Sequence, residues 1–330
     1  MKFPFNVYLP ALLVAFLTSF FSLPFWRRLT QRIGLVDDPG HRKIHRTPTP
    51  LAGGFAVLAG IVTPLFVAAL AFTLNFPWSH LGEQLARHGL KPANREIEIA
   101  AIVLGALGML LLGSLDDKFE LPPAVKFAGQ FLIAVLVAAA KVRITLFVHN
   151  TLFSYAVTIL WILTVTNAFN FMDNMNGLCA GLGAIAAWWF ALIAGMDGQY
   201  LVTLVALLTA GALLGFLPHN YPRATAFLGD AGSHLVGYLL AVMAILPHFY
   251  TRQRPHVWAV FTPLLILAVP LGDLAWVVLL RWRLGKPIYV GDNNHLSHRL
   301  VRSGLTQQRA VLLIWLVATF CGALAILAVL

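Results

Sequence analysis

Long apolar runs separated by short polar breaks recur along the whole of this 330-residue chain. A helix that crosses the hydrocarbon core of a membrane needs about 20 predominantly apolar residues, and most of the runs reach that length. The pattern predicts transmembrane helices near residues 7–26, 51–72, 98–115, 124–140, 151–168, 178–195, 200–217, 233–247, 258–280 and 308–328. We therefore expect an all-α integral membrane protein of about ten transmembrane helices, with residues 1–330 forming a single polytopic domain.

Composition supports this expectation and excludes a soluble class. Apolar residues make up 59% of the chain and charged residues only 11%, which is far from the composition of soluble domains. The formal net charge of +10 could indicate nucleic acid. The basic residues lie instead in short loops beside apolar segments, so membrane orientation explains them better and no nucleic-acid partner is expected.

The basic residues also predict an orientation. Most Lys and Arg residues follow the odd-numbered predicted helices, as Arg27, Arg28, Arg281 and Arg283 do. By the positive-inside rule these loops are cytoplasmic, so both termini lie outside. A prokaryotic plasma (inner) membrane is the expected location.

Carboxylates gather on the same side of the predicted topology. They are Asp37, Asp38, Asp116, Asp117, Asp173, Asp230 and Asp292. A carboxylate near the bilayer boundary is costly unless it is paired, hydrated or bound to a cation. Their convergence predicts a cytoplasmic-side active-site cleft that holds a metal ion or phosphate groups.

Two of the polar segments carry cations beside turn residues or carboxylates. In the first, which runs from Gly34 to Gly54, Lys43 and His45 can neutralise anionic oxygens. A membrane-orientation signal combined with turn residues would explain this loop as well. In the second, Asp116 and Asp117 raise one another's pKa, so one of them can accept a proton from a phosphate monoester or hold Mg²⁺. Lys126 offers a point charge for phosphate, and a solvated helix cap is the alternative for the aspartate pair.

Three further segments complete the candidate chemistry. Asn167, Asn170 and Asp173 are spaced at helical steps and can contact a sugar nucleotide or a metal, with interhelical hydrogen bonds as the alternative. Asp230 lies between glycines and suits Mg²⁺, or else it caps the following helix.

The last segment contains His295, His298 and Arg299, which can grip a diphosphate. Zinc is disfavoured because no cysteine or third histidine lies nearby. Asp273 is expected to be an intramembrane partner of Arg281.

Together these segments resemble the polyprenyl-phosphate N-acetylhexosamine-1-phosphate transferases of glycosyltransferase family 4, especially the WecA-like branch, over nearly the whole chain. The resemblance implies a cytoplasmic cleft, dependence on Mg²⁺ with Mn²⁺ as an option, and transfer of an N-acetylhexosamine 1-phosphate from a UDP-sugar to undecaprenyl phosphate. UMP and a lipid-diphosphate-sugar for the cell envelope would be the products. GlcNAc is the expected sugar, and a homodimer is an option.

The resemblance also implies residue roles. Asp116 would be the base that handles the lipid phosphate, Asp117 would organise the metal, and Asp230 would bind Mg²⁺ directly. Asp173 would support the metal and nucleotide region. Substrate and phosphate contacts would come from Lys43, His45, Lys126, Asn167, Asn170, Asn176, His295, His298 and Arg299.

The chain departs from the family pattern at two positions. Asn176 replaces a usual aspartate that is associated with nucleotide recognition, and Ser297 replaces a frequent histidine. An amide can still pair with a uracil edge. The competing functions are a phospho-MurNAc-pentapeptide transferase of the related MraY-like branch, a secondary transporter, and a catalytically silent scaffold of this fold.

Overall fold

The computed structural model describes residues 4–38, 48–73, 96–145, 148, 150–247, 257–287, 289 and 293–327. Each predicted transmembrane segment overlaps helical residues of the structure. The helices are α1 (Phe5–Arg32), α2 (Gly53–Thr73), α4 (Glu96–Phe119), α5 (Pro123–Ala139), α6 (Thr151–Met172), α7 (Leu178–Met196), α8 (Tyr200–Asn220), α9 (Gly229–Ile245), η1 (Val257–Phe261, a 3-10 helix), α10 (Thr262–Ile266), α11 (Ala268–Arg283), α12 (Leu296–Arg302) and α13 (Gln307–Leu327). The strands β1 (Val36–Asp37) and β2 (Thr49–Pro50) form a short antiparallel pair.

The helices confirm an all-α membrane protein with several spans. Among the described residues, seven helices are long and apolar enough to cross a membrane, or eight if one bent pair counts as a single span. The apolar helices α5 and α9 have 17 residues each. A 17-residue helix is about 26 Å long, at the lower end of what spans a bilayer. Length and composition thus support fewer spans than the ten predicted.

The prediction of one continuous helix over 258–280 is wrong. The structure has a bent pair there, Trp258–Ile266 and Ala268–Arg283, with an angle of 76° between the parts. Pro270 lies in the first turn of α11. A proline cannot donate to the carbonyl four residues earlier, here that of Ile266, and clashes with it, so Pro270 favours a kink or break at this position. The short helix α12 and the β1–β2 pair were also not predicted.

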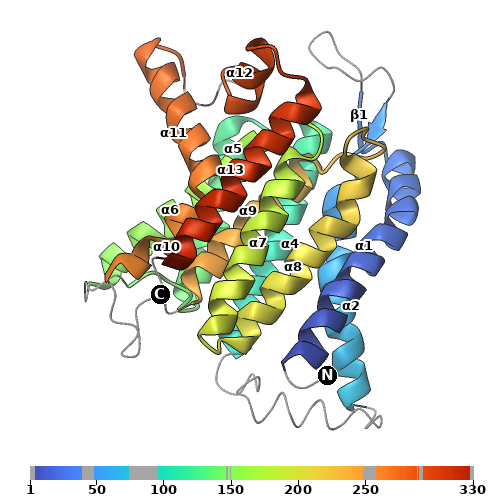
Figure 1. The fold of residues 1–330 in the computed structure, drawn as a ribbon, viewed down its shortest axis with the longest axis vertical. Coiled ribbons are helices and arrows are strands. Elements are labelled where there is room, and N and C mark those ends of the chain that lie inside the picture. The colour runs from blue at the N-terminus through green and yellow to red at the C-terminus, as the bar shows by residue number, and fades with distance from the viewer. Residues whose placement is uncertain are drawn as a thin grey trace.

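Helix α9 forms the centre of the bundle (Figure 1). It packs against α2, α4, α6 and α7. Nearly all of its residues from Gly229 to Ala244 are buried, which is expected of a helix with apolar residues on every side. The exception is Asp230 in its first turn, whose side chain is 32% exposed.

The polar segments meet at one end of the bundle. Helix α1 begins and α13 ends at the opposite end, whereas α12 and the β1–β2 pair lie at the polar end (Figure 1). The last turns of α4 and α6 and the first turns of α5 and α9 also lie at this polar end, because successive helices alternate in direction. This arrangement brings aspartates that are far apart in sequence close together in space.

Close backbone contacts fix the start of α9. The Phe227 N–H donates to the Pro50 carbonyl at 2.9 Å, and the Gly53 N–H donates to the Phe227 carbonyl at 2.9 Å. A Cβ atom on Gly54 would lie 2.7 Å from the Gly232 nitrogen, and one on Gly113 would overlap the Asp230 carbonyl. Helices α2 and α4 therefore approach α9 as closely as their backbones allow.

We predict that Gly113→Ala lowers both the thermal stability and the activity of the protein, because the new methyl group has to displace the backbone at Asp230. Overpacking of this kind costs about 1–3 kcal/mol. The matched control is Gly195→Ala, whose Cβ would lie 3.6 Å from Thr203 in ordinary contact. Thermal unfolding in detergent measures both variants, and equal melting temperatures would contradict the close approach of α4 and α9.

Candidate active site

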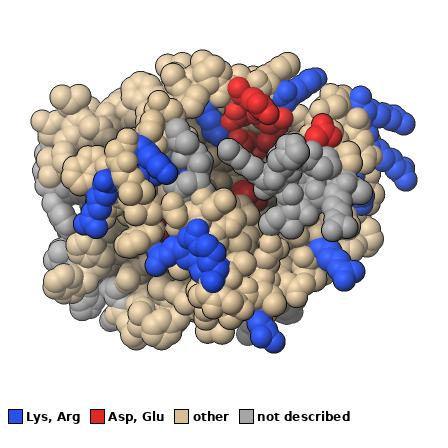
Figure 2. Space-filling model, turned by 90° about the horizontal axis from the view of Figure 1, so that it is seen from above, with Lys and Arg blue, Asp and Glu red and all other residues tan. Residues whose placement is uncertain are grey.

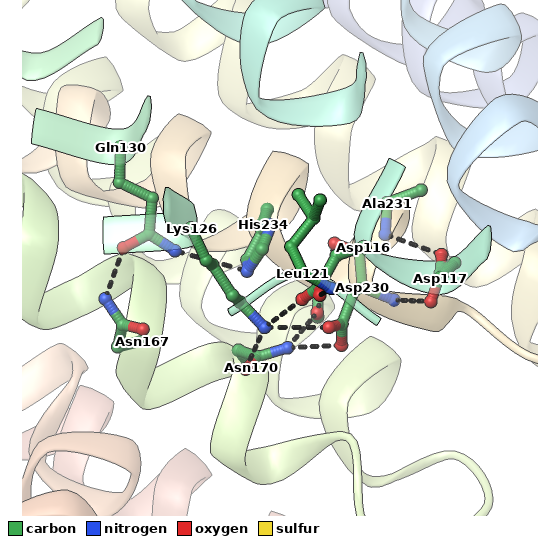
Figure 3. A network of polar contacts seen from close by, with 11 residues as sticks. Asp116, Asp117, Leu121, Lys126, Gln130, Asn167, Asn170, Asp230, Ala231 and His234 are labelled. Carbon is green, nitrogen blue, oxygen red and sulfur yellow. Dashed lines mark hydrogen bonds and ion pairs between the residues drawn. The ribbon is translucent and has the colours of Figure 1, made fainter. Parts of the chain in front are cut away.

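A lysine ammonium lies between two aspartates at the polar end of the bundle. Lys126 Nζ is 2.6 Å from Asp116 Oδ2 and 2.7 Å from Asp230 Oδ2 (Figure 3). The three side chains come from the first turn of α5, the last turn of α4 and the first turn of α9. The predicted convergence of Asp116, Lys126 and Asp230 is therefore present in the structure.

Asn170 of α6 completes this cluster. Its side-chain Nδ2 donates to Asp230 Oδ1 at 2.7 Å and to Ser233 Oγ at 3.0 Å, and its Oδ1 accepts from Lys126 Nζ at 3.4 Å. Both carboxylate oxygens of Asp230 are thus held by other side chains. We call Asp116, Lys126, Asn170 and Asp230 the upper layer.

Asp117 has a different set of partners from its neighbour Asp116. Its Oδ1 accepts from the Asp230 N–H at 2.8 Å, and its Oδ2 accepts from the Ala231 N–H at 3.0 Å. The first N–H groups of a helix have no partner within the helix, and a carboxylate there also meets the positive end of the helix dipole. Asp117 therefore caps α9 from another helix, a role that the sequence alternative assigned to Asp230 itself.

A second set of polar side chains lies next to the upper layer (Figure 3). Gln130 Nε2 lies 3.2 Å from His234 Nε2, and Asn167 Nδ2 donates to Gln130 Oε1 at 2.6 Å. Asn167 Nδ2 also donates to the Leu163 carbonyl at 2.8 Å. Asn167, predicted to contact substrate, thus has hydrogen bonds within the bundle.

A cavity of about 580 Å³ opens beside Asp230. Asp117, Asp173 and Asp230 line one part of it, and Asn176, Asn293 and His298 line another. Seen from the polar end, acidic residues gather near a hollow and Lys and Arg residues are spread around it (Figure 2). The cavity can hold part of an anionic ligand whose charge is balanced by cations.

Asp173 follows directly after α6 and faces other carboxylates. Loss of water contact and the charges of Asp230 and Asp117 raise the pKa of Asp173 to about 8. A cation among these carboxylates would relieve their repulsion. Asp173 therefore fits the predicted position beside a metal ion.

The carboxylates also fit the coordination habits of Mg²⁺. Within the part of the chain that the structure describes, no group of three or more His, Cys, Asp or Glu side chains could hold a metal ion by itself. Mg²⁺ commonly keeps several waters and takes only one or two carboxylates together with substrate phosphates. Asp230 and Asp173 on the cavity wall meet that smaller requirement.

The residues around α12 are anchored by Asp273. Asp273 Oδ2 lies 2.7 Å from His295 Nδ1, and Asp273 Oδ1 accepts from the Leu296 N–H at 2.6 Å. Asp273 thus binds the start of α12, whereas the sequence interpretation made it a partner of Arg281. The Arg281 guanidinium lies 5.2 Å from the centre of the Phe171 ring.

The three residues of the last loop that were predicted to bind phosphate, His295, His298 and Arg299, have different surroundings in the structure. His298 lines the cavity. His295 is buried against Asp273, and the Arg299 guanidinium lies 4.7 Å from the centre of the Trp276 ring. The departure residue Ser297 is buried and donates to Asn174 Oδ1 at 2.7 Å, which ties α12 to the segment after α6.

Asn176, the other departure residue, lies between two hollows. Its Nδ2 donates to the Pro222 carbonyl at 3.3 Å, which leaves its Oδ1 as an acceptor. It lines both the 580 Å³ cavity and an adjacent pocket of about 290 Å³, whose wall includes Tyr221 and Gln308. The predicted contacts from Lys43, His45 and Asp292 lie outside the described residues.

Sequence reasoning missed His234 and the true role of Asp273. His234 lies in an apolar run, where a single histidine gives little signal. Its spacing of four residues from Asp230, matching that of Gln130 from Lys126, was the available clue. Asp273 and His295 are 22 residues apart, so spacing could not indicate their contact.

The structure is a multi-pass membrane bundle with a lysine, several aspartates and a cavity at one end. A model of glycosyl transferase family 4 matches residues 99–248, which include the segment from Asp116 to His234. The chain is similar to the probable undecaprenyl-phosphate N-acetylglucosaminyl 1-phosphate transferase of Bacillus subtilis, with 30% identity over 93% of this chain and 81% of the relative.

Two further relatives agree with this match. The decaprenyl-phosphate N-acetylglucosaminephosphotransferase of Mycobacterium tuberculosis H37Rv is 33% identical over 92% of this chain and 78% of its own length. The undecaprenyl-phosphate alpha-N-acetylglucosaminyl 1-phosphate transferase of Escherichia coli K12 is 28% identical over 96% of this chain and 83% of its own length. The chain belongs to glycosyl transferase family 4, so the predicted family is confirmed.

We predict that Asp173→Asn makes stability less dependent on pH. A carboxyl with a pKa of about 8 when folded and an ordinary pKa when unfolded weakens the folded state progressively as pH rises from about 4 to about 8. The amide resembles the protonated acid and removes this loss. In EDTA, the melting temperature of the variant minus that of the wild type should therefore increase from pH 5 to pH 8.

Glu120→Gln, which changes an exposed carboxylate, is the control and should give a constant difference over that range. A constant difference for Asp173→Asn as well would contradict the raised pKa.

Proposed function

We propose that this protein transfers GlcNAc 1-phosphate from UDP-GlcNAc to undecaprenyl phosphate, releasing UMP and forming a lipid-diphosphate-sugar for cell-envelope polysaccharide. The observation that carries the proposal is the upper layer, in which Lys126 is held between Asp116 and Asp230 beside the 580 Å³ cavity. The printed names of the relatives support the sugar and the polyprenyl acceptor.

The proposed chemistry begins with the lipid phosphate. Asp116 accepts the proton of this phosphate, and one of its oxygens attacks the sugar-linked phosphorus of the UDP-sugar. The anhydride bond to the uridine-bearing phosphate breaks, and UMP leaves with the bonding electrons. Lys126 lies within reach of both Asp116 and Asp230, so its charge is fixed where phosphate oxygens gain negative charge.

The other residues orient the reacting groups. Asp117 holds the backbone of Asp230, and Asn170 holds its side chain. When bound, Mg²⁺ would be held by Asp230 and Asp173 with support from Asp117 and would neutralise diphosphate charge. His298 and Asn176 on the cavity wall would bind the phosphates and the nucleotide.

We also propose that the protein crosses a bacterial plasma membrane ten times. This requires the 17-residue helices α5 and α9 to span, and the bent α10–α11 pair to cross as one unit. Basic residues such as Arg27, Arg281 and Arg283 then lie at the cytoplasmic face together with the cavity. Both termini would lie on the outer face.

The test of this function is an assay of the purified protein in detergent with undecaprenyl phosphate, UDP-GlcNAc and Mg²⁺. We expect UMP and a lipid-linked GlcNAc diphosphate to form in equal amounts, and EDTA to stop both. UDP-GalNAc and UDP-MurNAc-pentapeptide serve as competing donors. Turnover of the pentapeptide donor alone would overturn the GlcNAc assignment, and failure with every donor would overturn the transferase.

We predict that Asp116→Asn lowers kcat at least about 100-fold while the protein remains folded, because the amide cannot accept the proton of the lipid phosphate. The amide oxygen can still accept from the Leu121 N–H, as Asp116 Oδ1 does at 2.9 Å. Glu120→Gln, four residues further along the chain, is the matched control. Wild-type kcat in Asp116→Asn would remove this residue from the chemistry.

A further inference from the structure

The polar side chains of Figure 3 form two layers related by about one helical turn. Gln130 follows Lys126 by four residues on α5, and His234 follows Asp230 by four residues on α9. Asn167 precedes Asn170 by three residues on α6, which runs in the opposite direction to the other two helices. We call Gln130, His234 and Asn167 the lower layer.

Two of the three lower-layer side chains are fully buried, and Asn167 is partly buried. Gln130 and His234 are both 0% exposed. Polar side chains inside a membrane bundle are costly unless they find partners, and a partly satisfied network is worse than an apolar core. Contacts of 2.6 Å and 3.2 Å within the lower layer satisfy part of this need and join α5, α6 and α9.

The direction of the hydrogen bonds follows from a backbone carbonyl. The Leu163 carbonyl can only accept, so the group of Asn167 that meets it is the Nδ2 donor. The same Nδ2 donates to Gln130, which therefore presents Oε1 to Asn167 and Nε2 to His234. His234 Nε2 must then accept, so the ring is neutral with its hydrogen on Nδ1.

His234 Nδ1 is buried and has no hydrogen-bond partner among the residues that the structure places. The Nδ1–H group of His234 thus stays unsatisfied, while its Nε2 accepts the hydrogen bond from Gln130. An apolar residue at this position would avoid that cost. Packing alone therefore does not account for a histidine beneath the upper layer.

We propose that the lower layer positions the upper layer for the proposed transfer reaction, and this inference rests on that function. The directional bonds of Gln130 and His234 set the spacing of α5 and α9, which carry Lys126 and Asp230 one turn away. Asn167 extends the same control to α6 and Asn170. Because all three lower-layer side chains are neutral, they fix the cluster without competing with it for phosphate or cations.

The experiment compares Gln130→Leu, His234→Leu and the double variant in a cycle of stability and kinetics. Gln130→Leu leaves His234 Nε2 without its donor and removes one of the two acceptors of Asn167 Nδ2, and His234→Leu leaves Gln130 Nε2 without its acceptor. We therefore expect a lower melting temperature and a lower kcat in each single variant. The double variant replaces both partners by apolar groups and should recover most of the melting temperature. Its kcat should remain about 10- to 100-fold below wild type, because the spacing constraint is lost.

The KM for UDP-GlcNAc should stay within about two-fold of wild type in the double variant, since these residues do not line the cavity. His234→Gln keeps an acceptor for Gln130 and should retain more kcat than His234→Leu. Thr209→Val is the matched control, because Thr209 is also buried but donates only to the Val205 carbonyl of its own helix.

Recovery of kcat together with the melting temperature in the double variant would overturn the inference, since the lower layer would then act only through packing. Equal kcat in His234→Gln and His234→Leu would overturn it as well, and this comparison applies even if the double variant does not fold. An inactive wild type with every donor would instead overturn the proposed function and the inference that rests on it.

Discussion

The ion pair cluster around Lys126 is the constraint on which this structure depends. Two aspartates at the end of a membrane bundle would repel one another, and Lys126 lies within 2.7 Å of both Asp116 and Asp230. Burial of one charge without its partners costs several kcal/mol, so the three side chains have to be brought together by the fold. The alternating directions of α4, α5 and α9 achieve this.

Backbone packing gives the cluster its precision. Gly54 and Gly113 allow α2 and α4 to approach the first turn of α9, and hydrogen bonds from Gly53 and Phe227 fix the segment before it. These contacts hold the main chain just before Asp230, and Asp117 holds the amides of residues 230 and 231. A site that must align two phosphates benefits from such rigidity.

Sequence patterns predicted those parts of the site that depend on helix ends and helical spacing. Asp116, Lys126 and Asp230 were found because charges at the ends of apolar runs are rare, and Asn170 because it shares a helical face with neighbouring polar residues. Pro270 was a signal for the bend, but a weak one, because α1, α2 and α8 continue through prolines. The family was predicted from the combination of segments.

The remaining parts depend on contacts that spacing does not encode. The partners of Asp117 are backbone N–H groups 113 and 114 residues away, which no motif reveals. Asp273 and His295 meet only because the fold brings the start of α12 to Asp273 of α11. His295 and Arg299 were predicted to bind phosphates, and the structure adds an aspartate and an indole as their neighbours, which spacing did not indicate.

Because Asp117 accepts hydrogen bonds from backbone amides, substitutions at positions 117 and 230 have different structural consequences. Because Asp117 binds the main chain at 230 and 231, the backbone there is held whatever side chain residue 230 carries. An exchange of residue 230 therefore removes a partner of Lys126 and of Asn170, whereas the main chain at the start of α9 stays held. The same exchange at position 117 would disturb the scaffold itself.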